Sequence, residues 1–219
     1  MNPHTQQKSA IRVCSLNINH SNAATHTTMH YITTHKDPPF DIILIQEPWW
    51  QEINSAFTMV SLTGWQLMLP KLNIWREECP RTVAYHKLST GINLTLRTDI
   101  TQDLDFMILN IGREKASWPP ITLINIYNQK TPVNNPGIPH EWTADWLQNH
   151  IPHHSTPMII AGDWNMRDPS WDNGIQGPTP HTCETLKWLY SLSFNLKNEP
   201  NVPTREDSSG HAVGGIMVL

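Results

Sequence analysis

The chain has 219 residues, of which 38% are hydrophobic and 16% charged, so it can bury one substantial core and is not a disordered protein. Its net charge of −4 gives no overall basic signature of a nucleic-acid-binding protein, although a local basic groove is compatible with it. The three cysteines are odd in number and far apart, which favours reduced thiols in an intracellular protein over disulfides or a zinc knuckle. We find no signal peptide and no apolar run of membrane-spanning length, and therefore expect no membrane association.

After a polar leader of residues 1–10, the sequence pattern predicts one α/β domain from residue 11 to residue 219. Thr63-Gly64 predicts a hairpin turn between two strands, 57–62 and 65–69. Further strands are expected at 11–18, 41–45, 82–85, 92–97, 104–111 and 121–126, and one more begins at Met158. Helices are expected at 23–35, 141–150 and 182–192. Many strands with few, short helices favour two packed sheets with helices outside.

The stretch from Met158 to Asn165 carries the most chemical information. An apolar run typical of a buried strand ends there in Gly-Asp-Trp-Asn. Because side chains alternate faces along a strand, we expect Asp163 and Asn165 to share a pocket and Trp164 to turn away and pack. A carboxylate that orients water, beside an amide that holds an anionic oxygen, suits phosphoryl chemistry.

Three other predicted strands also end in polar side chains. Asn17 and Asn19 end the first strand, Glu47 follows the second, and Tyr127 follows strand 121–126. Polar groups at the carboxyl ends of adjacent strands converge on one crevice, where such folds bind ligands. A site with few acidic side chains and several carboxamides suits Mg²⁺ better than zinc, because zinc prefers His and Cys ligands. The residues therefore indicate Mg²⁺-assisted attack of water on a phosphoester.

Four motifs in a fixed order resemble the endonuclease/exonuclease/phosphatase superfamily: Leu-Asn-Ile-Asn (16–19), Ile-Gln-Glu-Pro (45–48), Asn-Ile-Tyr-Asn (125–128) and Gly-Asp-Trp-Asn (162–165). The resemblance extends from about residue 11 to residue 211. Within the superfamily, residues 46–50 and 203–211 are similar to the apurinic-type endonuclease domain of fungal non-LTR (LINE-like) retrotransposons.

The resemblance implies a four-layer sandwich of the DNase I and apurinic endonuclease type, with two packed, mostly antiparallel β-sheets flanked by helices. It implies a hydrolase that uses Mg²⁺, or alternatively Mn²⁺, to nick DNA in the nucleus and leave a 3′-hydroxyl that primes reverse transcription. The reverse transcriptase of such an element is not part of this chain. We expect a monomer whose partner is target-site DNA.

The same resemblance implies a role for each site residue. Glu47 is the principal metal ligand, and Asn17 supports the metal site or the scissile phosphate. Tyr127 donates its hydroxyl toward the phosphate. Asp163 orients or deprotonates the attacking water, and Asn165 stabilises the charge that develops.

Three further residues are expected to contact substrate. Asn19 lies beside Asn17 in the first motif, and Thr204 matches the threonine of a DNA-contacting loop in the family. Trp49, with its neighbour Trp50, is expected to line the groove or stack on a splayed base.

The C-terminal residues depart from the family pattern. The family follows the threonine loop with a strand containing Ile-Asp and then a closing Ser-Asp-His. Here residues 213–219 read Val-Gly-Gly-Ile-Met-Val-Leu, with Ile216 about where the aspartate is expected. We therefore expect a C-terminally truncated domain that lacks the last strands, leaves one sheet edge unpaired and has impaired activity.

Other interpretations remain open at this point. A phosphatase of the same fold, acting on inositol or lipid phosphates, is one alternative, although no extra basic cluster for a polyphosphate is apparent. A non-catalytic nucleic-acid-binding remnant is another. His26 and His30 have the spacing of a helical metal pair, but a solvent-facing helix explains them better.

Overall fold

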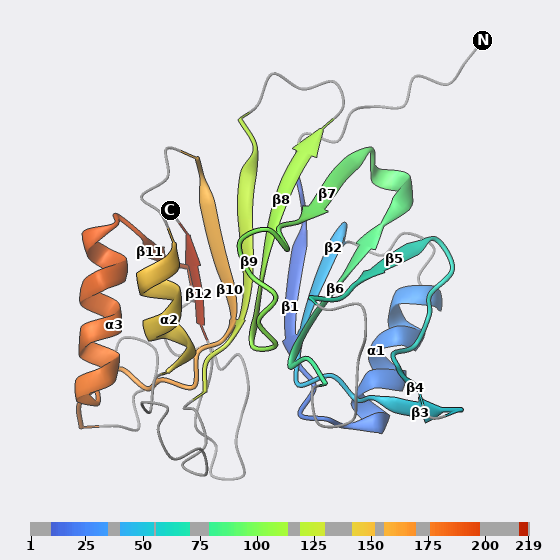
Figure 1. Cartoon of the computed structure of the whole chain (residues 1–219), viewed down its shortest axis with the longest axis horizontal. Coiled ribbons are helices and arrows are strands. Elements are labelled where there is room, and N and C mark those ends of the chain that lie inside the picture. Colours follow the sequence, from blue (N-terminus) through green and yellow to red (C-terminus); the bar gives the residue numbers. More distant parts are fainter. Residues whose placement is uncertain are drawn as a thin grey trace.

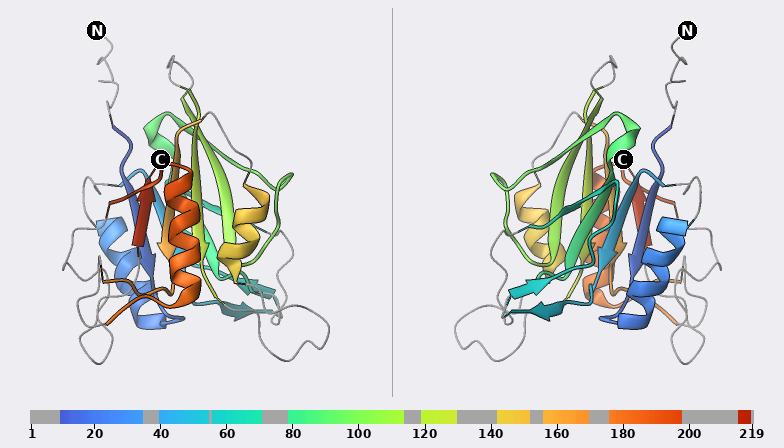
Figure 2. Two further views of the ribbon diagram at one scale, coloured as in Figure 1. Left: turned by 90° about the vertical axis from the view of Figure 1, so that its left-hand side faces the viewer. Right: turned by 90° about the vertical axis from the view of Figure 1, so that its right-hand side faces the viewer.

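The computed structural model describes residues 10–34, 40–54, 56–70, 79–113, 119–129, 142–151, 156–169, 176–197 and 215–218. Two β-sheets pack face to face, and the three described α-helices cover their outer faces (Figures 1 and 2). The predicted α/β sandwich is confirmed. None of the described helices has the length and apolar character needed to cross a membrane.

The four-stranded sheet has the strand order β1-β2-β6-β5. Its strands are β1 (Val13–Asn17), β2 (Ile42–Gln46), β6 (Thr82–Lys87) and β5 (Trp65–Met68). β1 and β2 are parallel and in register, with Asn17 opposite Gln46, and the other pairs are antiparallel. The parallel connection requires a crossover, which α1 (Asn22–Thr34) supplies on the outer face of this sheet.

The six-stranded sheet has the strand order β11-β12-β10-β9-β8-β7. Its strands are β11 (Asn195–Leu196), β12 (Gly215–Val218), β10 (Met158–Asp163), β9 (Ile121–Tyr127), β8 (Phe106–Arg113) and β7 (Ile92–Leu96). Only β9 and β10 are parallel, with Tyr127 opposite Asp163. Helices α2 (Thr143–His150) and α3 (Pro180–Ser191) cover its outer face (Figure 2).

Three apolar layers hold the sandwich together. Between the sheets, Leu44 of β2 packs in one cluster with Leu109 and Leu123 of the six-stranded sheet. A second cluster joins that sheet to α2 and α3, and a third joins the four-stranded sheet to α1. Because both faces of each sheet are covered, β2 is buried throughout, which explains its continuous apolar sequence.

The described strands divide between the sheets in chain order. All four strands of the four-stranded sheet precede residue 88, and all six strands of the other sheet follow residue 91. A short 3₁₀ turn, η2 (Leu88–Thr90), joins the two groups and ends at Gly91, whose φ of 66° is left-handed. Among the described strands, the chain therefore passes from one sheet to the other once.

The predicted hairpin at Thr63-Gly64 is wrong. β5 pairs with β6, while β4 (Ala56–Thr58) pairs with β3 (Gln51–Ile53) in a separate two-stranded ribbon. The turn of that ribbon contains Asn54, whose φ is 51°, a backbone conformation that asparagine tolerates better than most residues. Beyond β4, Met59 and Leu62 are buried in the core instead of extending a strand.

Residues 215–218, which depart from the family pattern, form a strand, so β10 is not left as an unpaired edge, and the expectation that further strands are missing stays a prediction. β12 pairs antiparallel with β10 on one side and with β11 on the other, with Ile216 opposite Ala161. Strand pairing needs backbone N–H and C=O groups, and these are present whether residue 216 is aspartate or isoleucine. β11 therefore forms this edge of the sheet.

A buried pair of amides links the two sheets. Asn125 of β9 is fully buried, and its Nδ2 donates to the carbonyl oxygens of Ile45 (3.2 Å) and Val83 (2.9 Å) in the facing sheet. Its Oδ1 accepts from Nε2 of Gln46, which also bonds to Ser15. Each amide group thus has a partner, and the register of one sheet on the other is fixed by hydrogen bonds as well as by packing.

We expect Asn125→Ala to reduce the free energy of unfolding by about 2 to 4 kcal/mol, because two carbonyls and a glutamine amide lose their partner in a buried site. Chemical denaturation measured by circular dichroism checks this. Asn93→Ala, at an exposed position of β7, is the matched control and should change stability by less than about 1 kcal/mol. Equal, small effects of both variants would contradict the role given to the amide pair.

None of the three cysteines, Cys14, Cys79 and Cys183, forms a disulfide bond in the structure. Burial raises the pKa of both Cys14 and Cys79, so their thiols are less ionised than exposed ones and are poor nucleophiles.

Candidate active site

The four predicted strand ends meet between the two sheets. β1 and β2 of one sheet lie against β10 of the other, so the carboxyl end of each parallel pair reaches the same region. The site is therefore built from both sheets.

Asn17 links the two acidic side chains of the site. Its Nδ2 donates to Oε2 of Glu47 at 2.9 Å and to Oδ2 of Asp163 at 2.6 Å. Its Oδ1 accepts from the backbone N–H of Asn19 at 2.7 Å. Since both carboxylates only accept hydrogen bonds, they require the amide nitrogen on this side. In this arrangement Asn17 positions the carboxylates, and its predicted role as metal support stays a prediction.

Glu47 is held at the end of β2 by its backbone. Its φ of 48° is left-handed, and its N–H donates to the carbonyl oxygen of Arg81 at 2.8 Å. The side chain is 13% exposed and accepts from the Tyr127 hydroxyl at 2.9 Å through Oε1. Both oxygens of the carboxylate are thus oriented by neighbours while one edge remains open to solvent.

Tyr127 is a proton donor in this arrangement. Burial, together with the hydrogen bond to Glu47 and the charges of Glu47 and Asp163, raises its pKa well above the ordinary value. Asn165 acts in the opposite direction but does not offset these effects. The hydroxyl therefore keeps its proton throughout the neutral range and can donate a hydrogen bond to an anionic oxygen.

Asp163 and Asn165 lie together, as predicted, but through a turn. Asp163 ends β10 and is 5% exposed, whereas Asn165 is exposed and has a left-handed φ of 47°. The backbone N–H of Asn165 donates to Oδ1 of Asp163 at 3.0 Å, and its Nδ2 donates to the carbonyl of Asn128 at 2.8 Å. Trp164 is 2% exposed and packs in the core under α2 and α3, which confirms the prediction for it.

The residues predicted to contact substrate are connected less directly to Glu47 and Asp163. Asn19 is exposed in the turn after β1 and reaches Asn17 through its backbone. Trp49 is half-buried beside the ring of His26, at a centroid distance of 5.8 Å. Trp50 is tied to the carbonyl of Pro80 and packs against the core. Thr204 lies outside the described residues, as do residues 203–211 as a whole.

Sequence reasoning gave no individual role to Asn128, although it closes the third motif. Its side chain donates to the carbonyl of Trp164 at 2.7 Å and accepts from the N–H of Ala144, in the first turn of α2, at 2.9 Å. Its own N–H donates to the carbonyl of Asp163. Asn128 thereby ties β9, β10 and α2 together behind the candidate site residues Tyr127 and Asp163. The only signal was its place next to Tyr127.

The two carboxylates fit a divalent cation. Glu47 and Asp163 bond to the same nitrogen atom, so they lie within two hydrogen-bond lengths of each other. Within the described residues, no lysine or arginine forms an ion pair with either. Two like charges this close favour a bound cation, and carboxylate oxygens are ligands that suit Mg²⁺. Among the described residues, no group of three or more His, Cys, Asp or Glu side chains is placed to hold a metal ion, so any ion here would depend on other oxygen ligands such as water.

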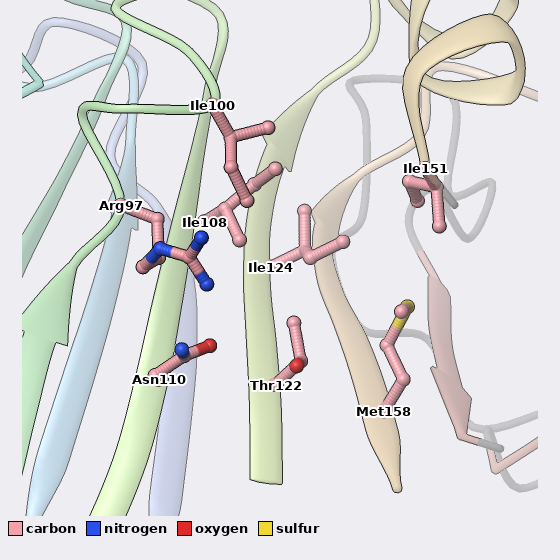
Figure 3. A pocket seen from close by; sticks show the side chains of 8 residues that line it. All are labelled: Arg97, Ile100, Ile108, Asn110, Thr122, Ile124, Ile151 and Met158. Atoms are coloured by element: carbon pink, nitrogen blue, oxygen red, sulfur yellow. The ribbon is translucent and has the colours of Figure 1, made fainter. Parts of the chain in front are cut away.

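A pocket elsewhere on the six-stranded sheet is not this site. It is lined mainly by apolar side chains, with Arg97, Asn110 and Thr122 among them (Figure 3). Thr122 and Met158 stand near the beginnings of β9 and β10, whereas Tyr127 and Asp163 end those strands. Five residues along a strand separate the two regions by roughly 17 Å.

Residues 14–208 match the Endonuclease/Exonuclease/phosphatase family. This chain belongs to that family. Its members are Mg²⁺-dependent phosphodiesterases, and the fold and the paired carboxylates described above agree with that chemistry. A comparison with curated protein sequences gave no significant match.

Solved structures share the fold at low identity. The endonuclease domain of TRAS1, a telomere-specific non-LTR retrotransposon, is 17% identical with a TM-score of 0.66, over 94% of this chain and 83% of that one. A family protein from Leptotrichia buccalis C-1013-b is 13% identical with a TM-score of 0.53, over 95% and 88%. A humanized D. rerio TDP2 is 10% identical with a TM-score of 0.53, over 95% and 82%.

Proposed function

We propose that this domain is a Mg²⁺-dependent endonuclease that nicks DNA, of the kind carried by non-LTR retrotransposons. The observation that supports it most is the bridge from Asn17 to Glu47 and Asp163, which joins a metal-binding carboxylate to a second carboxylate beside Tyr127. The fold similarity to the TRAS1 endonuclease domain and the Pro48-Trp49-Trp50 sequence favour DNA as the substrate. We also propose that the domain acts in the nucleus and that its partner is the target-site DNA.

Each residue has a distinct task in phosphodiester hydrolysis. Asp163 is held by Asn17 and by the N–H of Asn165, and its remaining lone pairs can accept a proton from the attacking water. Tyr127 would turn its hydroxyl from Glu47 to a phosphate oxygen, and Asn165 would use the second hydrogen of its amide nitrogen, because the first is bound to the carbonyl of Asn128. Both donors would then stabilise the negative charge that increases in the transition state. Glu47 would hold Mg²⁺, which supplies charge neutralisation at the phosphate.

A plasmid assay tests this proposal. The purified domain should convert supercoiled plasmid to the nicked form in Mg²⁺ and not in EDTA, leaving 3′-hydroxyl ends that a DNA polymerase can extend. Glu47→Gln should lower the nicking rate by about a hundredfold or more, because it removes the charge that holds the cation. Glu52→Gln, on the exposed strand β3, is the matched control and should not change the rate.

The two alternative functions, phosphatase and non-catalytic nucleic-acid binding, predict different results in the plasmid assay and in a parallel assay with inositol phosphates. Release of phosphate from inositol phosphates without nicking would indicate a phosphatase of the same fold. Salt-sensitive DNA binding by a folded sample without cleavage in Mg²⁺ would indicate a nucleic-acid-binding remnant. Either result would overturn the endonuclease proposal.

A further inference from the structure

His20 lies in a strained turn at the edge of the site. Asn19 and His20 are consecutive residues with left-handed φ values of 48° and 51°, a conformation that non-glycine residues rarely adopt. The N–H of His20 donates to the carbonyl of Glu47 at 2.7 Å, and Ile18 donates to the carbonyl of Gln46. The turn after β1 is thus tied to the end of β2, which brings the His20 ring beside the Glu47 carboxylate.

The hydrogen bond on the far side of the ring determines which nitrogen carries the proton. Nδ1 of His20 is 3.1 Å from the carbonyl oxygen of Pro48. A carbonyl only accepts, so Nδ1 is the donor and a neutral ring has its lone pair on Nε2. A histidine that binds a metal characteristically donates its other ring N–H to a carbonyl in this way.

The free nitrogen faces Glu47 at a distance that suits shared ligation. Nε2 is 3.6 Å from Oε1 of Glu47, which is longer than a charge-assisted hydrogen bond of about 2.7 to 2.9 Å. Two ligands bound to one ion at about 2.1 Å each lie about 3.0 to 4.2 Å apart as the angle between them opens from a right angle. Oε1 accepts one hydrogen bond, from Tyr127, and has a second lone pair available.

We propose that His20 is a metal ligand together with Glu47 and that its imidazole makes the site prefer Mn²⁺ to Mg²⁺. The preference follows from ligand chemistry, because imidazole nitrogen binds first-row transition metals well and Mg²⁺ strongly favours oxygen. The His20 side chain is 55% exposed, so the ion retains water ligands and an open position for a phosphate. This inference builds on the proposed metal-dependent function, but it concerns which residues bind the ion.

Metal binding can be measured without any substrate. Titration of the intact domain with MnCl₂, followed by the electron paramagnetic resonance signal of free Mn²⁺, gives the dissociation constant. His20→Asn should raise that constant at least about tenfold and change the Mg²⁺ constant, measured by competition, less than about threefold. Asparagine is chosen because it tolerates the left-handed φ of this position. His30→Asn, on the exposed face of α1, is the matched control and should leave both constants unchanged.

Pulsed electron paramagnetic resonance of the wild-type protein tests the ligand directly and does not depend on the folding of a variant. Mn²⁺ bound through imidazole shows modulation from the ¹⁴N nucleus, and this modulation should be present. Its absence, or an unchanged Mn²⁺ constant in His20→Asn, would overturn the inference and indicate an ion pair between His20 and Glu47. Nitrogen coupling without plasmid nicking would support His20 as a metal ligand and reject the endonuclease function. Mg²⁺-dependent nicking without nitrogen coupling would support the endonuclease function and reject His20 as a ligand.

Discussion

Replacing Gly162 with alanine is expected to prevent stable folding. A Cβ atom at this position would lie 1.9 Å from the carbonyl oxygen of Ile126, on the neighbouring strand β9. The obstacle is backbone at the centre of the six-stranded sheet, so no flexible side chain can move away. The φ of 149° adds strain for any residue with a side chain. We expect a loss of more than about 4 kcal/mol, which is comparable to the whole stability of many domains.

Soluble yield, circular dichroism and chemical denaturation check this expectation. Gly112→Ala is the matched control, because Gly112 also lies in a strand of the same sheet and the carbonyl oxygen of Asn93, on the neighbouring strand β7, would be 3.9 Å from the new Cβ. That variant should retain the native spectrum and change stability by about 1 kcal/mol or less. A Gly162→Ala protein with native stability would show that β9 and β10 do not approach this closely.

Asp163→Asn is expected to lower the rate of DNA nicking by about a thousandfold to ten-thousandfold, because asparagine has the same shape but cannot accept a proton from water. Two effects on stability oppose each other. Asparagine keeps only one acceptor oxygen, so it loses the hydrogen bond from Asn17 or the one from the N–H of Asn165, but it also removes one of two neighbouring negative charges. We therefore expect the melting temperature without metal to change by only a few degrees. Single-turnover nicking and thermal unfolding measure the two effects separately.

Asp99→Asn is the control for this second substitution, since Asp99 is an exposed aspartate whose only described ion pair is with Arg97. It should leave the nicking rate unchanged. Retained activity in Asp163→Asn would rule out Asp163 as the proton acceptor. A melting temperature lowered by many degrees would instead indicate that Asp163 is mainly a structural residue.

Strand positions and the location of the site could be predicted from local sequence. Buried strands such as β2 and β10 are continuous apolar runs, and the polar residues Glu47 and Asp163 stand out where those runs stop. Strand pairing could not be predicted in the same way. The turn at Asn54, which has no glycine after it, was a weaker signal than Thr63-Gly64, yet it closes the β3–β4 ribbon. Pairing depends on which surfaces are buried in three dimensions, and short segments do not carry that information.

The contacts that hold the site residues in place also could not be predicted from local sequence. Asn17 and Asp163 are 146 residues apart, and no spacing rule connects them. His20 was not predicted as a site residue. Its position beside Glu47 depends on the left-handed backbone of Asn19 and His20, which the sequence Asn-His does not predict. Asn125 and Asn128 were within a recognised motif, but their partners lie on other elements. Motif order therefore indicated where the candidate site lies, and the structure showed which residues hold its side chains in place.

Because the described strands cross from one sheet to the other once, the site is formed by two consecutive halves of the chain, one before η2 and one after it. Glu47 and His20 come from the half before η2, while Tyr127 and Asp163 come from the half after it. Neither half contains a working site, and their contacts join residues far apart in sequence, which slows such assembly during folding. Both proposed metal ligands lie in the first part of the chain, whereas the proposed proton acceptor Asp163 lies in the second. Two separately produced fragments divided near Gly91 would therefore be expected to nick DNA only when mixed.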